Sequence, residues 1–295
     1  MAAEDDHARI VDRITDTHEQ RIVDSLQRLE LEIEAILDDA PVRQGKLFDL
    51  AWSVNARTTI NEAIENIYLG EADALVRDYD RIQESLATMF DEYGTLLDVP
   101  EEVIVNLKRI SFQGFQDIAV TFTDELANEL YQNTLTGRTR SESIKSLRQK
   151  INGVYIQSDQ VEIQRLVDIA NAGGEAAEDA VRQLHQVYAA DRAGRNMRRY
   201  ARQMATDAAN QYNASLNVSA GQRVGATKWK YFGSLIQDSR KFCEDTVNKE
   251  FTEDEIREIW STQDWAGKAP GDPFVVRGGY NCRHHWRPVF DSETE

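Results

Sequence analysis

Apolar residues recur every three or four positions near the start of the chain, and charged residues fill the positions between them. The members of this first stripe are Ile10, Ile14, Ile22, Leu26, Leu29, Ile33 and Ile36. Such a period places the side chains on one face of an α-helix. The sequence therefore predicts a long amphipathic helix that ends before Pro41.

The same spacing continues through the middle of the chain. No proline occurs from 101 to 269, which favours helices because an interior proline removes a backbone hydrogen bond. Thr139 and Glu142 have the spacing of a capping box, which marks a helix start. The expected helical segments are 47–90 with Ile60, Ile64 and Ile67 as its stripe, 100–130 with Leu107, Ile110 and Phe115, then 139–153, 158–171 and about 175–210, with Gly194 as a point of interruption in the last.

The pattern changes at Thr227. The aromatic stretch TKWKYFGS predicts a strand, and WRPVF predicts a second strand that Pro288 confines to a sheet edge. Between them, Thr252 and Glu255 form a second capping box, which predicts a short helix. We expect a mainly α protein, in which long amphipathic helices are followed by a small C-terminal α+β module. The expected regions are an N-terminal helical region 1–98, a central helical region 99–226 and the C-terminal module 227–295.

Composition excludes some classes of protein. A net charge of −17 argues against wrapping nucleic acid with the whole surface, because phosphate binding needs a positive field. No stretch approaches the roughly 18 apolar residues that a membrane span requires. The acidic N-terminus also lacks the basic and apolar parts of a secretory signal. We therefore expect no membrane partner and a cytosolic protein in the cell that makes it.

A group of arginines contrasts with this acidic background. Its members are Arg192, Arg195, Arg198, Arg199 and Arg202. On a continuous helix, positions 192, 195, 199 and 202 share one face. This stripe is a candidate contact for phosphates or for an acidic protein surface. The alternative is a solvated face that pairs with the chain's own carboxylates.

Cysteine and histidine chemistry is concentrated in the C-terminal module. Cys243, Cys282 and His284 are a candidate zinc-ligand set, since zinc binds thiolates and imidazoles tetrahedrally. The usual paired spacing is missing, because Thr246 stands three residues after Cys243. We expect two buried thiols without a cofactor, and zinc or a Cys243–Cys282 disulfide are the alternatives.

Catalysis is the less favoured interpretation of the same module. His284 and His285 would lie near Asp238, Glu244 and Asp245 if the module folds back on itself. Adjacent residues on a strand point to opposite faces, so the two imidazoles would not converge on one substrate. No metalloprotease, nucleophile-elbow, phosphate-loop or dinucleotide motif is present. We therefore expect no enzyme and assign no catalytic residue.

Several segments together carry a family resemblance over residues 135–290. They are GRTRSESIKSLRQKI, the helical segment with Arg199, Thr206 and Asn210, the element DSRKFC with Asp238, Arg240 and Cys243, and the turn Asn281-Cys282-Arg283 before a Pro-Val strand. This combination resembles the phage head morphogenesis proteins, the Mu F-like minor head proteins. Many members carry cysteines where Thr246 and His284 stand here, so His284 would replace a cysteine as a ligand.

The resemblance implies a minor head protein of a tailed phage or prophage, without enzymatic activity. The expected partners are the portal protein and major capsid or scaffold proteins, with packaged DNA as a further contact. The expected location is the virion, in the head interior or at the portal vertex, and the host cytoplasm during assembly. Two alternatives remain: an effector or toxin-like enzyme, such as a metal-dependent nuclease, that uses the module for delivery, and a DNA-binding packaging accessory.

Overall fold

The structure, a computed structural model, confirms the mainly α fold. It describes residues 2–95, 97–154, 157–172, 176–177, 179–180, 182–183, 195–236 and 239–289. Arg192 and Asp238, which the sequence analysis singled out, lie outside these residues, as does most of the helix expected from about 175.

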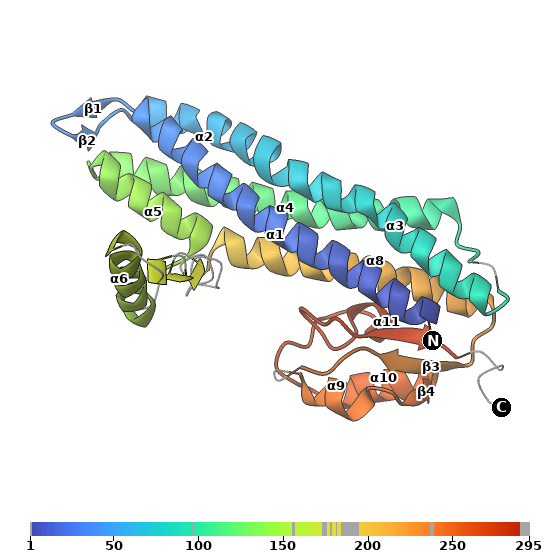
Figure 1. Cartoon of the computed structure of the whole chain (residues 1–295). Helices are drawn as coiled ribbons and strands as arrows, with labels where there is room; N and C mark the ends of the chain where they lie inside the picture. The colour runs from blue at the N-terminus through green and yellow to red at the C-terminus, as the bar shows by residue number, and fades with distance from the viewer. Residues whose placement is uncertain are drawn as a thin grey trace. The chain divides into compact units, whose positions relative to one another are not determined.

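Long helices dominate the described chain, and α1, α3, α4 and α8 run as continuous ribbons in Figure 1. The helices before the C-terminal module are α1 (Ala2–Asp38), α2 (Leu50–Ile64), α3 (Gly70–Glu92), α4 (Glu101–Leu135), α5 (Arg140–Asn152), α6 (Gln157–Ala172) and α8 (Met197–Arg223). A short antiparallel pair, β1 (Val42–Arg43) and β2 (Lys46–Leu47), follows α1. Among the described residues, no helix combines the length and the apolar character that a membrane span requires.

The chain packs as two compact units, and the long helices contribute to both. Unit 1 contains residues 1–20, 71–115 and 203–295, and unit 2 contains residues 21–70 and 116–202. These units differ from consecutive regions of the sequence, because each of the long helices α1, α4 and α8 passes from one unit into the other.

In unit 1, the helices meet through polar as well as apolar contacts. His7 of α1 is buried. Its Nδ1 atom lies 2.7 Å from the hydroxyl of Ser85 on α3, and its Nε2 atom lies 2.8 Å from the amide oxygen of Asn213 on α8. The rings of Tyr79 and Tyr212 stack with centroids 4.3 Å apart, which joins α3 to α8. Burial of these side chains holds the N-terminal part of α1 against both helices.

Unit 2 buries most of the first predicted stripe. Ile22, Leu26, Leu29 and Ile33 of α1 are buried as predicted, whereas Leu37 takes the buried position that was expected for Ile36. Arg148 of α5 bonds the carboxylates of Glu30 and Glu34 on α1, with 2.7 Å to Glu30. The capping box of Thr139 and Glu142 is present at the start of α5.

Two further predicted stripe positions are wrong. A π-helical turn, η1 (Glu65–Leu69), connects α2 to α3, and its wider turn buries Tyr68 in place of Ile67. On α4, Ile110 is 60% exposed, because the buried face of that helix follows Phe115 and Phe122.

The C-terminal module is built on a three-stranded antiparallel sheet. The strands are β3 (Lys228–Phe232), β4 (Glu250–Thr252) and β5 (His285–Pro288), in the order β4-β3-β5. Both predicted strands are therefore confirmed, and β5 with Pro288 lies at an edge. The short helices of the module are α9 (Lys241–Thr246), α10 (Glu253–Thr262) and α11 (Pro273–Val276). The second capping box, Thr252 with Glu255, begins α10 as predicted.

Large aromatic rings fill the interior of the C-terminal module. Its buried core consists of Trp229, Tyr231, Phe242, Cys243, Ile256, Phe274, Cys282 and Trp286. The sequence predicts core roles for Trp229 and Trp286, which the structure confirms, and Trp265 packs against the cluster. The same expectation for Tyr280 is wrong, because its side chain is 41% exposed and only its backbone belongs to the packed turn.

Candidate metal centre

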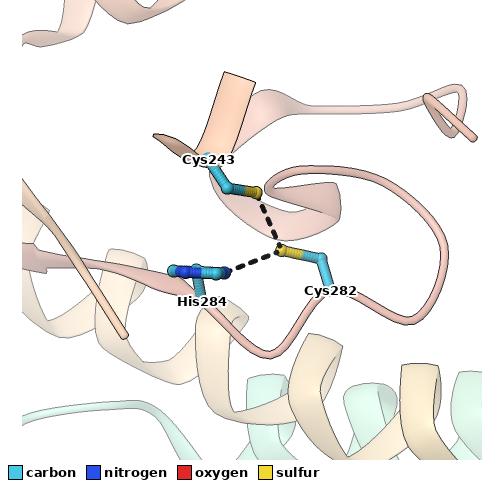
Figure 2. A group of neighbouring side chains, drawn as sticks. All are labelled: Cys243, Cys282 and His284. Atoms are coloured by element: carbon cyan, nitrogen blue, oxygen red, sulfur yellow. Dashed lines mark hydrogen bonds between the residues drawn. The ribbon is translucent and has the colours of Figure 1, made fainter. Parts of the chain in front are cut away.

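Three soft donor side chains converge inside the C-terminal module. Figure 2 shows the side chains of Cys243, Cys282 and His284 directed toward one another. The Sγ atoms of the two cysteines lie 4.0 Å apart, and Cys282 Sγ lies 3.7 Å from His284 Nδ1. All three donor atoms lie within 4.8 Å of one another, and each residue is buried. The structure therefore brings together the three residues that the sequence analysis proposed as ligands.

Cys243 is positioned by the start of α9. Arg240 is the N-terminal cap residue of this helix, so Cys243 lies in its first turn. The guanidinium of Arg240 donates to the carbonyl oxygens of Ala266, at 3.1 Å, and Tyr280, at 2.5 Å. Arg240 thus ties the α9 end of the site to the turn that carries Cys282.

Cys282 is positioned by a strained turn. Asn281 adopts a φ of 58°, in the left-handed region that asparagine tolerates better than most residues. Its backbone N–H donates to Asp207 of α8 at 2.7 Å, and Arg277 donates to the carbonyl oxygen of Cys282 at 2.9 Å. These two bonds fix the backbone on both sides of the Cys282 side chain.

Gly278 packs against the sulfurs. A β-carbon at this position would lie 2.6 Å from Cys243 Sγ and 2.9 Å from Cys282 Sγ, too close for any side chain. Trp265 Nε1 donates to the Gly278 carbonyl oxygen at 2.8 Å and holds this backbone in place. Glycine is therefore required here by close approach rather than by its backbone angles.

Tyr231 of β3 completes the surroundings of the donor atoms. Its hydroxyl lies 3.6 Å from Cys243 Sγ and 3.3 Å from Cys282 Sγ, and its ring stacks on His284 with centroids 5.2 Å apart. His285 instead packs against Phe232, the next residue along β3. The two histidines therefore have different neighbours, as the alternation of a strand predicts.

The two thiols differ in their electrostatic surroundings. The hydrogen bond with Cys243 lowers the pKa of the Cys282 thiol well below its usual range, and His284 and Arg277 act in the same direction. The same contact with Cys282, together with burial, raises the pKa of Cys243. A first deprotonation therefore places a thiolate on Cys282, and the thiolate is the form of cysteine that binds metals.

Burial limits what this cluster can do chemically. Both cysteines are free thiols, and their separation is about twice the roughly 2.05 Å of a disulfide bond. The donor residues have 2%, 3% and 6% exposure for Cys243, Cys282 and His284, so a substrate has no direct access to them. The arrangement suits internal packing or a buried structural metal better than catalysis.

The arginine group is only partly a surface feature. Arg198 is fully buried, so its side chain does not belong to the exposed part of the group. Arg195 and Arg199 are exposed, and Arg195 forms a 2.9 Å ion pair with Glu125. Because α8 begins only at Met197, Arg195 precedes the helix and does not extend the face on which Arg199 and Arg202 were expected.

Other residues of the site escaped the sequence analysis. Arg283, which is part of the resemblance, pairs with Asp16 and Glu19 of α1, at 2.8 and 3.9 Å. The buried guanidinium of Arg277 donates to the Cys282 carbonyl oxygen and was not singled out by the sequence. The available signal was its position in FVVRGG, where a single arginine follows apolar residues. Asp207 was harder to identify from the sequence, because it is recognisable only as a single carboxylate in an alanine-rich segment.

Comparison with known proteins adds no further evidence on identity. No protein-family model, curated protein or solved structure matches this chain.

Proposed function

We propose that this chain is a minor head protein of a tailed phage or prophage, which binds the portal and acts in head assembly, DNA packaging or genome delivery. The proposal starts from the sequence resemblance to the Mu F-like minor head proteins. One structural observation supports it: residues that carry the resemblance form a connected framework in unit 1, although they are far apart in sequence.

The framework joins the C-terminal module to α8 and α1. Arg240 bonds the Tyr280 carbonyl, and Cys243 contacts Cys282. The turn at Asn281 bonds Asp207, which directly follows Thr206, another residue of the resemblance. Thr206 in turn donates to Glu19 of α1 at 3.1 Å. A pattern that maintains such a framework is expected of a binding protein whose helices must be held in a defined arrangement.

The distribution of charge on the chain suggests which residues would bind its partners. With a net charge of −17, the chain as a whole repels DNA, which limits nonspecific binding inside a packed head. Arg195 and Arg199 are exposed cations in this acidic background. They remain the candidate contacts for an acidic portal surface or for DNA phosphates.

Co-purification tests the proposal. The full-length chain is co-expressed with the portal protein of its own genome, and retention on DNA is measured separately over a salt series. We expect the chain to co-purify with the portal and to be found in purified particles. Absence from particles together with failure to bind the portal would refute the proposal. Salt-sensitive DNA retention without portal binding would favour the packaging accessory.

Charge reversal at the exposed arginines tests the contact itself. Arg195→Glu combined with Arg199→Glu should weaken portal or DNA binding. Arg77→Glu on α3 is the matched control, because Arg77 is also an exposed arginine, with 70% of its side chain accessible. Equal binding by both variants would exclude this surface as the contact. Activity assays on nucleic acid substrates address the alternative of an effector enzyme.

A further inference from the structure

We propose that Cys243, Cys282 and His284 bind a structural zinc ion inside the C-terminal module, through two thiolates and the Nδ1 atom of the imidazole. The inference rests on the geometry of these side chains and does not depend on the proposed function. Two thiolates and an imidazole are a donor set that zinc prefers.

The distances between the donor atoms match a tetrahedral site. With zinc–sulfur bonds of about 2.3 Å and zinc–nitrogen bonds of about 2.0 Å, tetrahedral edges are about 3.8 Å between sulfurs and about 3.5 Å between sulfur and nitrogen. The observed separations are 4.0 Å and 3.7 Å. These two edges are therefore within a few tenths of an ångström of the values for a bound zinc ion, and the third, between Cys243 and His284, is at most 4.8 Å long.

The Tyr231 hydroxyl is the candidate for the fourth ligand position. Its distances of 3.6 and 3.3 Å from the two sulfurs are also those of a tetrahedral edge. Stacking on His284 fixes the Tyr231 ring, and β3 fixes its backbone. Four polar atoms from three separate segments therefore surround one point in an aromatic core.

The backbone around the site is already restrained without a metal. Arg240, Asp207 and Arg277 fix the two cysteine-bearing segments through bonds to the backbone of residues 280 to 282. A preorganised site loses less conformational entropy when it binds a metal. Zinc binding would close a loop between cysteines that are 39 residues apart, which stabilises the module against unfolding. The protons of coordinated thiols are released to solvent.

Metal analysis of the full-length, tag-free chain tests the site. We expect one zinc ion per chain after purification under reducing conditions without chelators. Replacement of zinc by cobalt should give the intense visible bands of tetrahedral cobalt and a near-ultraviolet thiolate-to-cobalt band. A wild-type chain that takes up neither zinc nor cobalt would overturn the proposal, as would a Cys243–Cys282 disulfide in the reduced preparation.

Variants assign the ligands. Cys282→Ser and His284→Asn should each lower zinc affinity about tenfold or more, and Tyr231→Phe should do so by about tenfold. His285→Asn is the matched control, because His285 is the adjacent histidine and packs on Phe232 instead of on the sulfurs. Far-ultraviolet circular dichroism shows whether each variant retains its helices. Unchanged affinity in folded Cys282→Ser or His284→Asn, or equal loss in His285→Asn, would contradict the assignment.

This experiment is independent of the portal experiment. Zinc is measured on the isolated chain, and portal binding is measured with the partner present. A chain that binds zinc but no portal would refute the proposed function alone, whereas a metal-free chain found in particles would refute the zinc site alone.

Discussion

The helical part of the chain and the C-terminal module bury their apolar side chains in different ways. In the helices, aliphatic residues such as Leu26 and Leu29 repeat along one face, so the buried surface is spread over many turns. In the module, a few large rings from short strands and short helices fill the interior, and the thiols of Cys243 and Cys282 lie among them. Each side chain of the module therefore accounts for a larger share of its core, and loops must be held by specific contacts.

The largest expected effect lies in the module. Trp286 is buried and its ring lies 4.6 Å from Tyr231, 5.8 Å from Phe251 and 5.9 Å from Phe274, measured between centroids. Trp286→Ala should lower the free energy of unfolding by about 3–5 kcal/mol, because it removes the ring that joins the others. Urea unfolding monitored by near-ultraviolet circular dichroism measures this loss.

The control for this prediction is Tyr280→Ala, in the same module. The Tyr280 side chain is 41% exposed, so its removal should change the unfolding free energy by only about 0.5 kcal/mol. A loss below about 1 kcal/mol in Trp286→Ala would show that the aromatic cluster does not dominate the core of the module.

In the helices, the corresponding test compares two leucines of α1. Leu26 is fully buried and Leu31 is 64% exposed. Leu26→Ala should cost about 2–5 kcal/mol, and Leu31→Ala about 0.5 kcal/mol or less, as both variants keep a residue that favours helix. Thermal and urea unfolding measure both values. Similar losses for the two variants would contradict the burial of this face.

The same contrast explains how much of the fold was predictable. The stripe on α1, both capping boxes and the strands β3 and β5 were predicted because each depends on residues that are close in sequence. The π-helical turn that buries Tyr68 was not predicted, because a single wider turn does not change the spacing of apolar residues enough to be recognised in the sequence. Gly194 indicates a break before α8, but the shared helix face expected for Arg195 and Arg199 ignored that break, because α8 begins only at Met197.

The site was predicted only in part. Cys243, Cys282 and His284 were recognisable by residue type, because few other residues offer soft donor atoms. The residues that hold them were not recognisable, since Tyr231 and Asp207 act through contacts across long stretches of sequence. Asparagine tolerates the left-handed backbone of Asn281, but that tolerance alone does not select this position among the chain's other asparagines.

The helical core of unit 1 contains a buried titratable group. Burial lowers the pKa of His7 from 6.5 to about 4, partly offset by its hydrogen bond with Asn213. Below pH 6.5 the His7 imidazole of the unfolded chain binds a proton, whereas in the folded chain it stays neutral down to about pH 4. The stabilisation from a neutral His7 is therefore present above pH 6.5 and lost as the pH falls through this window.

This loss is on the order of 3 kcal/mol between the two pH values. His7→Gln keeps a polar side chain but cannot titrate, so its unfolding free energy should fall less steeply from pH 6.5 to pH 4. Urea unfolding at several pH values compares the two slopes, and the other histidines are present in both proteins. Parallel slopes would mean that His7 is not buried as a neutral side chain.

The smallest expected effect tests whether the two regions differ at the level of local structure. Thr139 begins α5 in unit 2 and Thr252 begins α10 in the module, and each forms the same reciprocal bonds with a glutamate three residues later. Thr139→Ala and Thr252→Ala should each cost about 1 kcal/mol, because a cap satisfies the same backbone N–H groups wherever the helix lies. Serine at either position should restore most of the loss. Urea unfolding measures the four variants side by side. If Thr252→Ala cost several times more than Thr139→Ala, the start of α10 would depend on the tertiary packing of the module, and the difference between the two regions would extend from their cores to their helix ends.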